Sequence, residues 1–186
     1  MMRNVRDRRR RMGLAFALVA LAGLLLLPAT GGSPALAATC QEMAVNGGFE
    51  SSDGWQTSSN GSYALFSNYL ARSGEQAAHL AGVDNAVDSA TTTLALPADS
   101  TIALSFWWQV QTQESGGGYD ALSVVIADSQ GNPLFVVAGL SDLNAVDVWQ
   151  ETSVDLSAFA GQTVQLGIEA RTDGSGRADV TYSVID

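Results

Sequence analysis

The chain has 186 residues, of which 46% are hydrophobic and 15% are charged, and it carries nine basic against 19 acidic residues. That length allows one globular domain with a sizeable core. The formal net charge of −10 argues against nucleic acid and anionic lipid surfaces as partners, because both are negatively charged themselves.

Residues 1–37 are predicted to form a signal peptide. Six arginines precede an uninterrupted apolar stretch over residues 13–27, and Ala35-Leu36-Ala37 forms an A-x-A cleavage site. A retained membrane anchor is the alternative, but a transmembrane helix needs about 20 apolar residues, and this stretch has 15. We therefore expect export by the general or the twin-arginine route, cleavage before Ala38, and no membrane span in the mature chain.

The mature chain is strongly acidic. It keeps three basic and 18 acidic residues, a formal charge of −15, and it has no lysine. Such an excess of carboxylates leaves oxygens free to hold a hard cation such as Ca²⁺. Cys40 is the only cysteine, so an internal disulfide is impossible. A cell-surface lipoprotein anchored through Cys40 is a minor alternative to a secreted extracellular protein, because Ala37 and Thr39 fit that signal poorly.

After a flexible start over residues 38–45, apolar and polar residues alternate in short runs that turn residues separate. This pattern is typical of an all-β sandwich, and residues 46–186 are expected to form one such domain. The predicted strands are, in chain order, residues 62–66, 77–81, 89–96, 101–113, 121–128, 133–138, 148–155, 163–172 and 178–185.

Three local features follow from these predicted strands. The longest strand, 101–113, alternates so that Phe106 and Val110 lie on a core face, and Trp107 lies on a wetter face. Between the strands at 148–155 and 163–172, Phe159 is expected to be tucked into the core. Residues 173–176 have the composition of a hairpin-type turn.

The residues needed for common enzyme mechanisms are scarce. His79 is the only histidine, and it lies inside a predicted strand, where a lone histidine is more often structural than catalytic. The sequence contains no G-x-S-x-G elbow, no H-E-x-x-H zinc motif and no P-loop lysine. Paired carboxylates for glycoside hydrolysis remain an alternative, because acidic residues abound. We therefore expect a protein that is not an enzyme.

Several motifs in order resemble a known family. The opening Asn46-Gly47-Gly48-Phe49-Glu50, followed by Gly54-Trp55, resembles the start of bacterial carbohydrate-binding modules with a jelly-roll fold. Residues 104–108, 128–132 and 155–163 are similar to accessory domains of secreted bacterial peptidases and surface proteins. The resemblance extends over nearly the whole mature chain and implies a jelly-roll β-sandwich of two antiparallel sheets, which is galactose-binding-like in architecture.

The resemblance also implies a structural Ca²⁺ site. Its ligands here are Glu50, the loop containing Ser73, and Asp186 at the end of the last strand. Such a site would join the two ends of the domain. The alternative is that Glu50 caps a turn and that Asp186 is simply terminal. Asp120, beside a glycine-rich loop, is expected to bond backbone amides, with a second ion as the alternative.

A polysaccharide or glycan site is predicted from aromatic and polar residues on outward faces, because pyranose rings stack on aromatic rings while amide and charged groups bond their hydroxyls. The predicted ligand-binding residues are Trp107, Gln109 and Gln111 on one strand, and Gln165, Glu169 and Arg171 on another. We expect these two strands to share a concave sheet. The alternative is that a loop caps Trp107. The other aromatic candidates are Trp55, Tyr63, Tyr119 and Trp149.

Three functions are compatible with the sequence. The first is a secreted, non-catalytic module that binds carbohydrate or mediates cell-surface adhesion. The second is a structural accessory domain of an extracellular assembly or secreted peptidase, with no small ligand. The third, less favoured, is a weak polysaccharide-active enzyme. An exposed Trp107 in a groove would favour the first function, and a flat Ser/Thr-rich face with buried tryptophans would favour the second.

Overall fold

A computed structural model describes residues 40–112, 117–146, 148–174 and 180–185, with backbone alone for residues 180–185. Cys40–Asp186 forms one compact unit. The predicted signal peptide, residues 1–37, and the predicted calcium ligand Asp186 lie outside the described residues. None of the helices in the described part of the chain is long and apolar enough to cross a membrane.

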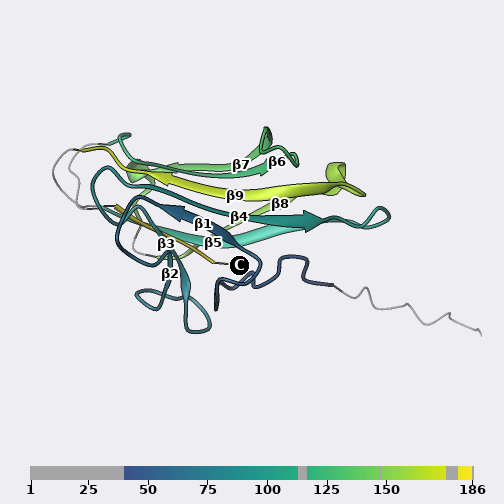
Figure 1. Ribbon diagram of the computed structural model, residues 1–186, viewed down its shortest axis with the longest axis horizontal. Coiled ribbons are helices and arrows are strands. Elements are labelled where there is room, and N and C mark those ends of the chain that lie inside the picture. The colour runs from purple at the N-terminus through teal and green to yellow at the C-terminus, as the bar shows by residue number, and fades with distance from the viewer. Residues whose placement is uncertain (1–39, 113–116, 147, 175–179, 186) are drawn as a thin grey trace, which may run out of the picture. The chain divides into compact units, whose positions relative to one another are not determined.

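The described residues are built almost entirely of strands, as the sequence predicts (Figure 1). The ten strands are β1 Gln56–Ser59, β2 Phe66–Ser67, β3 Ala77–Leu80, β4 Val87–Ala95, β5 Ala103–Thr112, β6 Ala121–Ala127, β7 Pro133–Ser141, β8 Gln150–Asp155, β9 Thr163–Arg171 and β10 Val180–Ile185. Two single-turn 3-10 helices, Asp142–Asn144 and Ser157–Phe159, interrupt the loops before β8 and β9.

The strands form two five-stranded antiparallel sheets. Sheet A has the order β1-β4-β9-β6-β7, and sheet B has the order β2-β3-β10-β5-β8. Most connections pass from one sheet to the other, so that the two sheets enclose one core. This is the jelly-roll β-sandwich that the sequence predicts.

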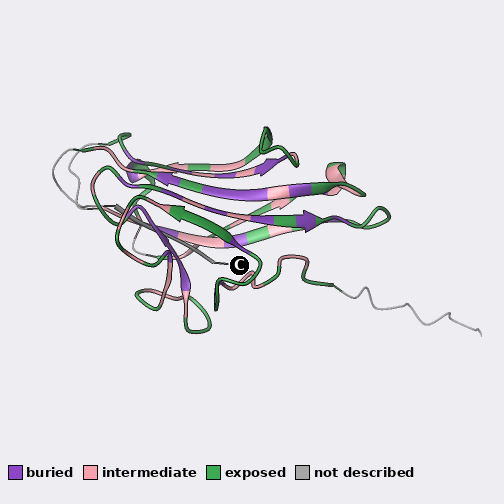
Figure 2. Cartoon of the chain, in the orientation of Figure 1, coloured by how far each residue is buried: buried purple, intermediate pink, exposed green. Residues whose placement is uncertain are grey.

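The core is made by the inward residues of each strand. Along β4 and β9 buried and exposed residues alternate (Figure 2), and pairs such as Ala90 with Ile168 and Leu94 with Val164 lie opposite each other. Phe49, Trp55 and Phe66 close one side of the core, with ring centroids 4.9 Å apart for Phe49 and Trp55. Phe159 packs against the core, as expected.

Two of the predicted elements are wrong. The sequence predicts a strand at residues 62–66, but only Phe66–Ser67 is a strand there, and Tyr63 donates a hydrogen bond to Asp88 instead. The hairpin predicted at residues 173–176 does not exist, because β9 pairs with β4 and β6 whereas β10 pairs with β3 and β5. The chain crosses between sheets at this point. Alternation indicates a strand, but it does not indicate which sheet the strand joins.

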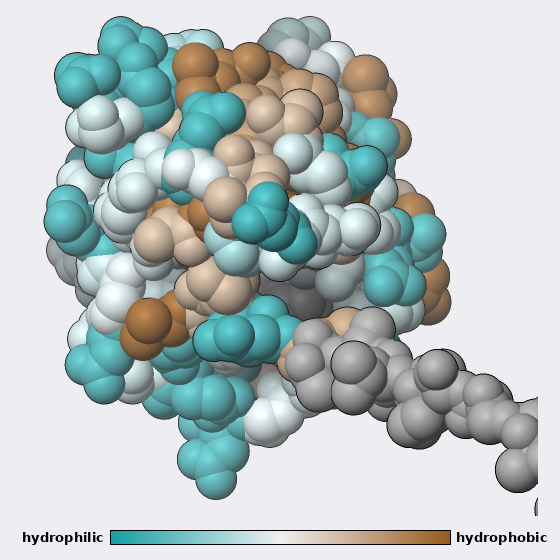
Figure 3. Space-filling model, turned by 90° about the vertical axis from the view of Figure 1, so that its right-hand side faces the viewer, coloured by the Kyte–Doolittle hydropathy of each residue, from teal (hydrophilic) through white to brown (hydrophobic). Residues whose placement is uncertain are grey.

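The first half of β7, an edge strand of sheet A, is apolar and exposed. Leu134, Phe135 and Val136 are exposed at consecutive positions, and the register with β6 shifts twice along this stretch. Figure 3 shows apolar residues gathered at the top of this end of the molecule, where Figure 1 places β7.

Candidate functional site

The predicted carbohydrate-binding residues are divided between the two sheets. Trp107, Gln109 and Gln111 belong to β5 in sheet B, whereas Gln165, Glu169 and Arg171 belong to β9 in sheet A. Their neighbours along each strand, such as Phe106 and Ile168, are buried in the core, so both sets face outward. The outer faces of the two layers lie on opposite sides of a sandwich. The expectation that β5 and β9 share one concave sheet is therefore wrong.

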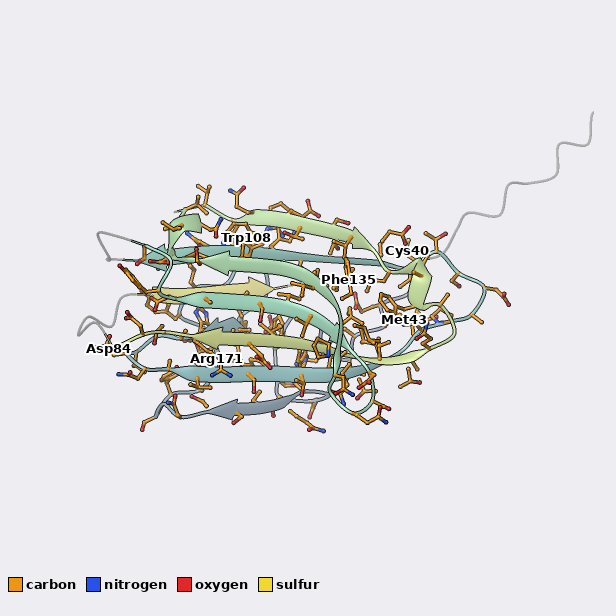
Figure 4. The ribbon with its side chains drawn as sticks, turned by 90° about the horizontal axis from the view of Figure 1, so that it is seen from above. Cys40, Met43, Asp84, Trp108, Phe135 and Arg171 are labelled. Atoms are coloured by element: carbon orange, nitrogen blue, oxygen red, sulfur yellow. The ribbon has the colours of Figure 1, made fainter. Side chains whose placement is uncertain are left out.

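The outer face of sheet A carries no aromatic ring along its three central strands, all of which the structure describes. The outward residues of its three central strands are Val87, Ser89, Thr91, Thr93, Ala95, Ala121, Ser123, Val125, Ala127, Thr163, Gln165, Gly167, Glu169 and Arg171. Arg171 is exposed at one end of β9 (Figure 4). A hollow of about 180 Å³ near β1 is lined by residues that include Gln56, Thr91 and Gln165. This face offers hydrogen bonds but no aromatic platform for a sugar ring.

The outer face of sheet B is crossed by residues 68–76, which join β2 to β3 and are named here the cover segment. The backbone N–H of Leu70 donates to Nε2 of His79 at 3.3 Å. The rings of Tyr69 and His79 meet edge to face, with centroids 5.6 Å apart. The guanidinium carbon of Arg72 lies 3.6 Å from the ring centroid of Trp107. Since His79 is in β3 and Trp107 is in β5, with β10 between them, the cover segment spans three strands.

The cover segment explains why outward-facing polar residues are buried. His79 and Gln109 lie in one row across β3, β10 and β5, and their exposed fractions are only 7% and 5%. Trp107 is half-buried, with Arg72 in cation–π contact over its ring. The alternative drawn from the sequence has Trp107 capped by a loop and buried; in the structure Arg72 lies over the ring, and the ring is half-buried. Tyr69, by contrast, is 71% exposed.

A second anchor holds the other end of the cover segment. The carboxylate of Glu50 accepts hydrogen bonds from the backbone N–H of Glu75, at 2.9 and 3.1 Å, and of Gln76, at 3.3 Å. Gly74 has a φ of +64°, and a Cβ built on it would overlap Oε1 of Glu50, so a side chain at this position would strain the backbone and displace the carboxylate. Beside this anchor is an open hollow of about 470 Å³, lined by Phe66, Ser67, Asn68, Glu75 and Gln76.

The same anchor contains two of the predicted calcium ligands. Glu50 accepts hydrogen bonds from backbone N–H groups two and three residues after Ser73, so the two predicted ligands lie in the same region of the structure. Among the described residues, however, no group of three or more acidic, histidine or cysteine side chains could hold a metal. Ca²⁺ takes six to eight oxygen ligands, and the described residues supply one carboxylate with backbone carbonyls. The fit is incomplete within the described residues, and the site remains a prediction that depends on Asp186.

Buried carboxylates tie the loops at one end of the sandwich. Asp88 is 1% exposed and accepts hydrogen bonds from the Tyr63 hydroxyl at 2.5 Å and the Ala81 N–H at 2.6 Å. Burial, together with the hydrogen bond to Asp88, raises the pKa of Tyr63 to about 12. Asp120 accepts from the N–H of Asp173 at 2.9 Å. These bonds favour structural roles for Asp120 and Tyr63.

The sequence did not single out Tyr69 and Arg72. Arg72 is one of only three cations after residue 37, and this scarcity is the one signal that the sequence offers. Its contact with Trp107 joins residues 35 positions apart in the sequence, and no local pattern predicts such a contact.

No protein-family model matches the sequence, and a search of curated proteins gives no match. Solved structures do match in fold. TmCBM61, solved in complex with beta-1,4-galactotriose, has a TM-score of 0.55 at 15% identity, over 78% of this chain and 96% of that chain. A family 16 carbohydrate-binding module has a TM-score of 0.50 at 16% identity, over 78% and 96% of the two chains.

The chain folds like a carbohydrate-binding module. At these identities the likeness concerns the fold alone, because functional sites vary widely on a shared β-sandwich. The chain spans nearly the full length of both modules, so the fold likeness applies to a whole domain.

Proposed function

We propose that this protein is an exported, non-catalytic module that binds a polysaccharide or glycan on the outer face of sheet B, beside the cover segment. The observation that carries the proposal is a pair of exposed side chains on the cover segment, Tyr69 against His79 and Arg72 over the Trp107 ring. Aromatic rings provide apolar faces for pyranose rings, and the guanidinium of Arg72 provides hydrogen-bond donors for sugar hydroxyls.

The hollow at the base of the cover segment supports the same location. Ser67, Asn68 and Gln76 place hydroxyl and amide groups on its wall, and Phe66 contributes an apolar surface. Carbohydrate sites need this mixture of apolar and polar groups. The outward residues of β4, β9 and β6 include no aromatic ring, so we do not include Gln165, Glu169 and Arg171 in the proposed site. Gln109 lies buried under the cover segment and supports the site from below.

A structural accessory domain is the second candidate. Two observations favour it: Arg72 already occupies the Trp107 ring, and sheet A presents a Ser/Thr-rich face. On this alternative the cation–π pair only fixes the cover segment, and the domain has no small ligand.

The test is affinity electrophoresis of the mature domain, residues 38–186, in a panel of soluble polysaccharides. We expect one polymer to retard the domain, Tyr69→Ala and Trp107→Ala to weaken binding by roughly five- to thirtyfold, and Arg171→Ala on sheet A to bind normally. Loss of a stacking ring costs about 1–2 kcal/mol, which corresponds to that factor. If no polymer retards the wild-type domain, or if Arg171→Ala alone loses binding, the proposed site is wrong.

Export and the lack of catalysis belong to the same proposal. The N-terminal sequence of the secreted protein is expected to start at Ala38. A polymer that retards the domain should release no reducing ends on long incubation with it. Release of sugar would instead favour the third candidate, a polysaccharide-active enzyme.

A further inference from the structure

Arg72 is an exposed cation in a strongly acidic protein. Its guanidinium carbon lies 3.6 Å from the ring centroid of Trp107, and this side chain makes no hydrogen bond or ion pair with the described residues. Residues 38–186 contain 18 acidic residues and only three basic ones. Although carboxylates are abundant, Arg72 is held on a ring, so all the hydrogen-bond donors of its guanidinium are available to a ligand.

The distance to Trp107 determines how the guanidinium is oriented. Carbon atoms in van der Waals contact lie about 3.5–4.0 Å apart, so the two groups touch at 3.6 Å. A guanidinium standing on its edge would bring a nitrogen roughly 1 Å closer to the ring, because its C–N bonds are about 1.3 Å long, and the two groups would overlap. The guanidinium therefore lies nearly flat on the ring, and its N–H groups point sideways along the outer face of sheet B.

An arginine stacked in this way is prepared to bind a carboxylate. Its planar fork of donors matches the two oxygens of a carboxylate, and such pairs are frequently bidentate. The aromatic ring holds the fork in place without using its donors, so less side-chain entropy is lost when a ligand binds. Trp107 is then a positioning residue that acts through Arg72.

Carboxylates near Arg72 limit the charge that this region accepts. Glu151 of β8 lies opposite Trp107 in the ladder and is exposed, and Glu75 is exposed on the cover segment itself. Together with the formal charge of −15 on the mature chain, these groups repel a polyanion. A single carboxylate on an otherwise neutral chain meets Arg72 at contact distance, whereas salt screens it from charges more than about 8 Å away.

The ring of Tyr69 lies at a distance that suits a neighbouring sugar residue. Tyr69 is 71% exposed and contacts His79 of β3, whereas Arg72 lies over Trp107 of β5. One strand, β10, separates β3 from β5. Since neighbouring strands are about 4.8 Å apart, the two side chains lie about 10 Å apart across the sheet. A short oligosaccharide can bridge that span.

We propose that the carbohydrate site on sheet B is specific for a glycan with isolated uronic acid residues, whose carboxylate is bound by Arg72 while a neutral sugar residue stacks on the ring of Tyr69. This inference rests on the proposed function and names its class of ligand. It also gives the contact between Arg72 and Trp107 a role in binding, whereas a sugar that stacked on Trp107 would first have to displace Arg72.

The test is affinity electrophoresis of residues 38–186 in galactan, mannan and β-glucan, each in three forms. The first form is sparsely oxidised at C6 to uronate. The second is the same material after carboxyl reduction, which restores the neutral polymer, and the third is oxidised at nearly every residue. We expect the sparsely oxidised form of one polymer to bind about tenfold more tightly than its reduced form, which is the effect of one charge-assisted pair. The fully oxidised form should bind more weakly than the sparsely oxidised one.

Variants of the protein locate the selectivity. Arg72→Gln should bind the sparsely oxidised and reduced forms equally, and Arg72→Lys, which keeps the charge but lacks the planar fork, should retain only part of the preference. Tyr69→Ala should weaken the binding of both forms by the same factor. Arg171→Gln on sheet A is the matched control, because it changes the net charge equally, and it should keep the full preference.

The outcomes separate this inference from the proposed function. If no polymer retards the wild-type domain in any form, the proposed function is wrong and the uronate specificity is wrong with it. If the domain binds but shows no preference for the sparsely oxidised form, or binds the fully oxidised form most tightly, only the uronate specificity is wrong. The same holds if Arg72→Gln keeps the preference. The comparison of polymer forms uses the wild-type protein, so it decides the matter even if that variant does not fold.

Discussion

The outer faces of the two sheets are built from similar strands but have different surroundings. The outer face of sheet A holds serine, threonine, valine and a few charged residues, and no described segment crosses its central strands. The outer face of sheet B holds His79, Gln109 and Trp107, and the cover segment lies across it. In both sheets, successive side chains along a strand point alternately inward and outward. Burial on the outward side is therefore decided by a loop, through contacts distant in sequence, and not by the strands themselves.

The largest expected effect tests whether the Glu50 anchor holds the cover segment in place. Gly74→Ala adds a Cβ at a positive φ and against the Glu50 carboxylate, so we expect a loss of about 3 kcal/mol in the free energy of unfolding. Gly131→Ala is the matched control, because Gly131 also has a positive φ, +85°, but has open space around it. It should lose about 1 kcal/mol. Urea unfolding compares the two, and equal losses would show that the anchor contributes little.

The next largest expected effect is stabilisation of the domain by Ca²⁺ at the Glu50 anchor. If Glu50, the Ser73 loop and Asp186 form the predicted site, Ca²⁺ at 100 times its dissociation constant should stabilise the domain by about 2.7 kcal/mol. Calorimetric unfolding with Ca²⁺ and with chelator measures it, and Glu50→Gln should remove the difference. Glu169→Gln on sheet A is the control and should retain it. A wild-type domain whose melting temperature ignores both Ca²⁺ and chelator would contradict the predicted site.

The smallest expected effect is a pH dependence of the free energy of unfolding that arises from His79 in sheet B. Burial lowers the pKa of His79 below its ordinary 6.5, while the Leu70 backbone opposes this more weakly. The unfolded chain therefore binds a proton more readily than the folded domain. The stability from neutral His79 is fully present above pH 6.5 and is lost as the pH falls below that value. His79→Gln, measured by urea unfolding at pH 7.5 and 5.0, should lose less stability on acidification than the wild type does. An identical loss would mean that His79 is not responsible.

Much of the fold follows from the sequence, because alternation and turn residues are local signals. The strands around Ala90, Phe106 and Leu166 were predicted within a few residues. β1 was missed, because Gln56–Ser59 is wholly polar and lies at a sheet edge with its side chains mostly exposed. The site was less predictable. The sequence predicts Trp107 as a ring on an outward face, but it does not predict Arg72 as the partner of that ring. The assignment of β5 and β9 to separate sheets depends on tertiary pairing that no single strand encodes.

The position of β10 has a consequence for how the protein is made. β10 lies between β3 and β5, and its residue Tyr182 pairs with Leu80 of β3, about one hundred positions earlier. Sheet B therefore cannot be completed on the ribosome until nearly all of the described chain has been synthesised. Pairings this distant form slowly, which leaves a nascent chain unfolded for longer. If the proposed export uses a channel that admits unfolded chains, this delay would keep the chain in a translocatable state until it has crossed the membrane.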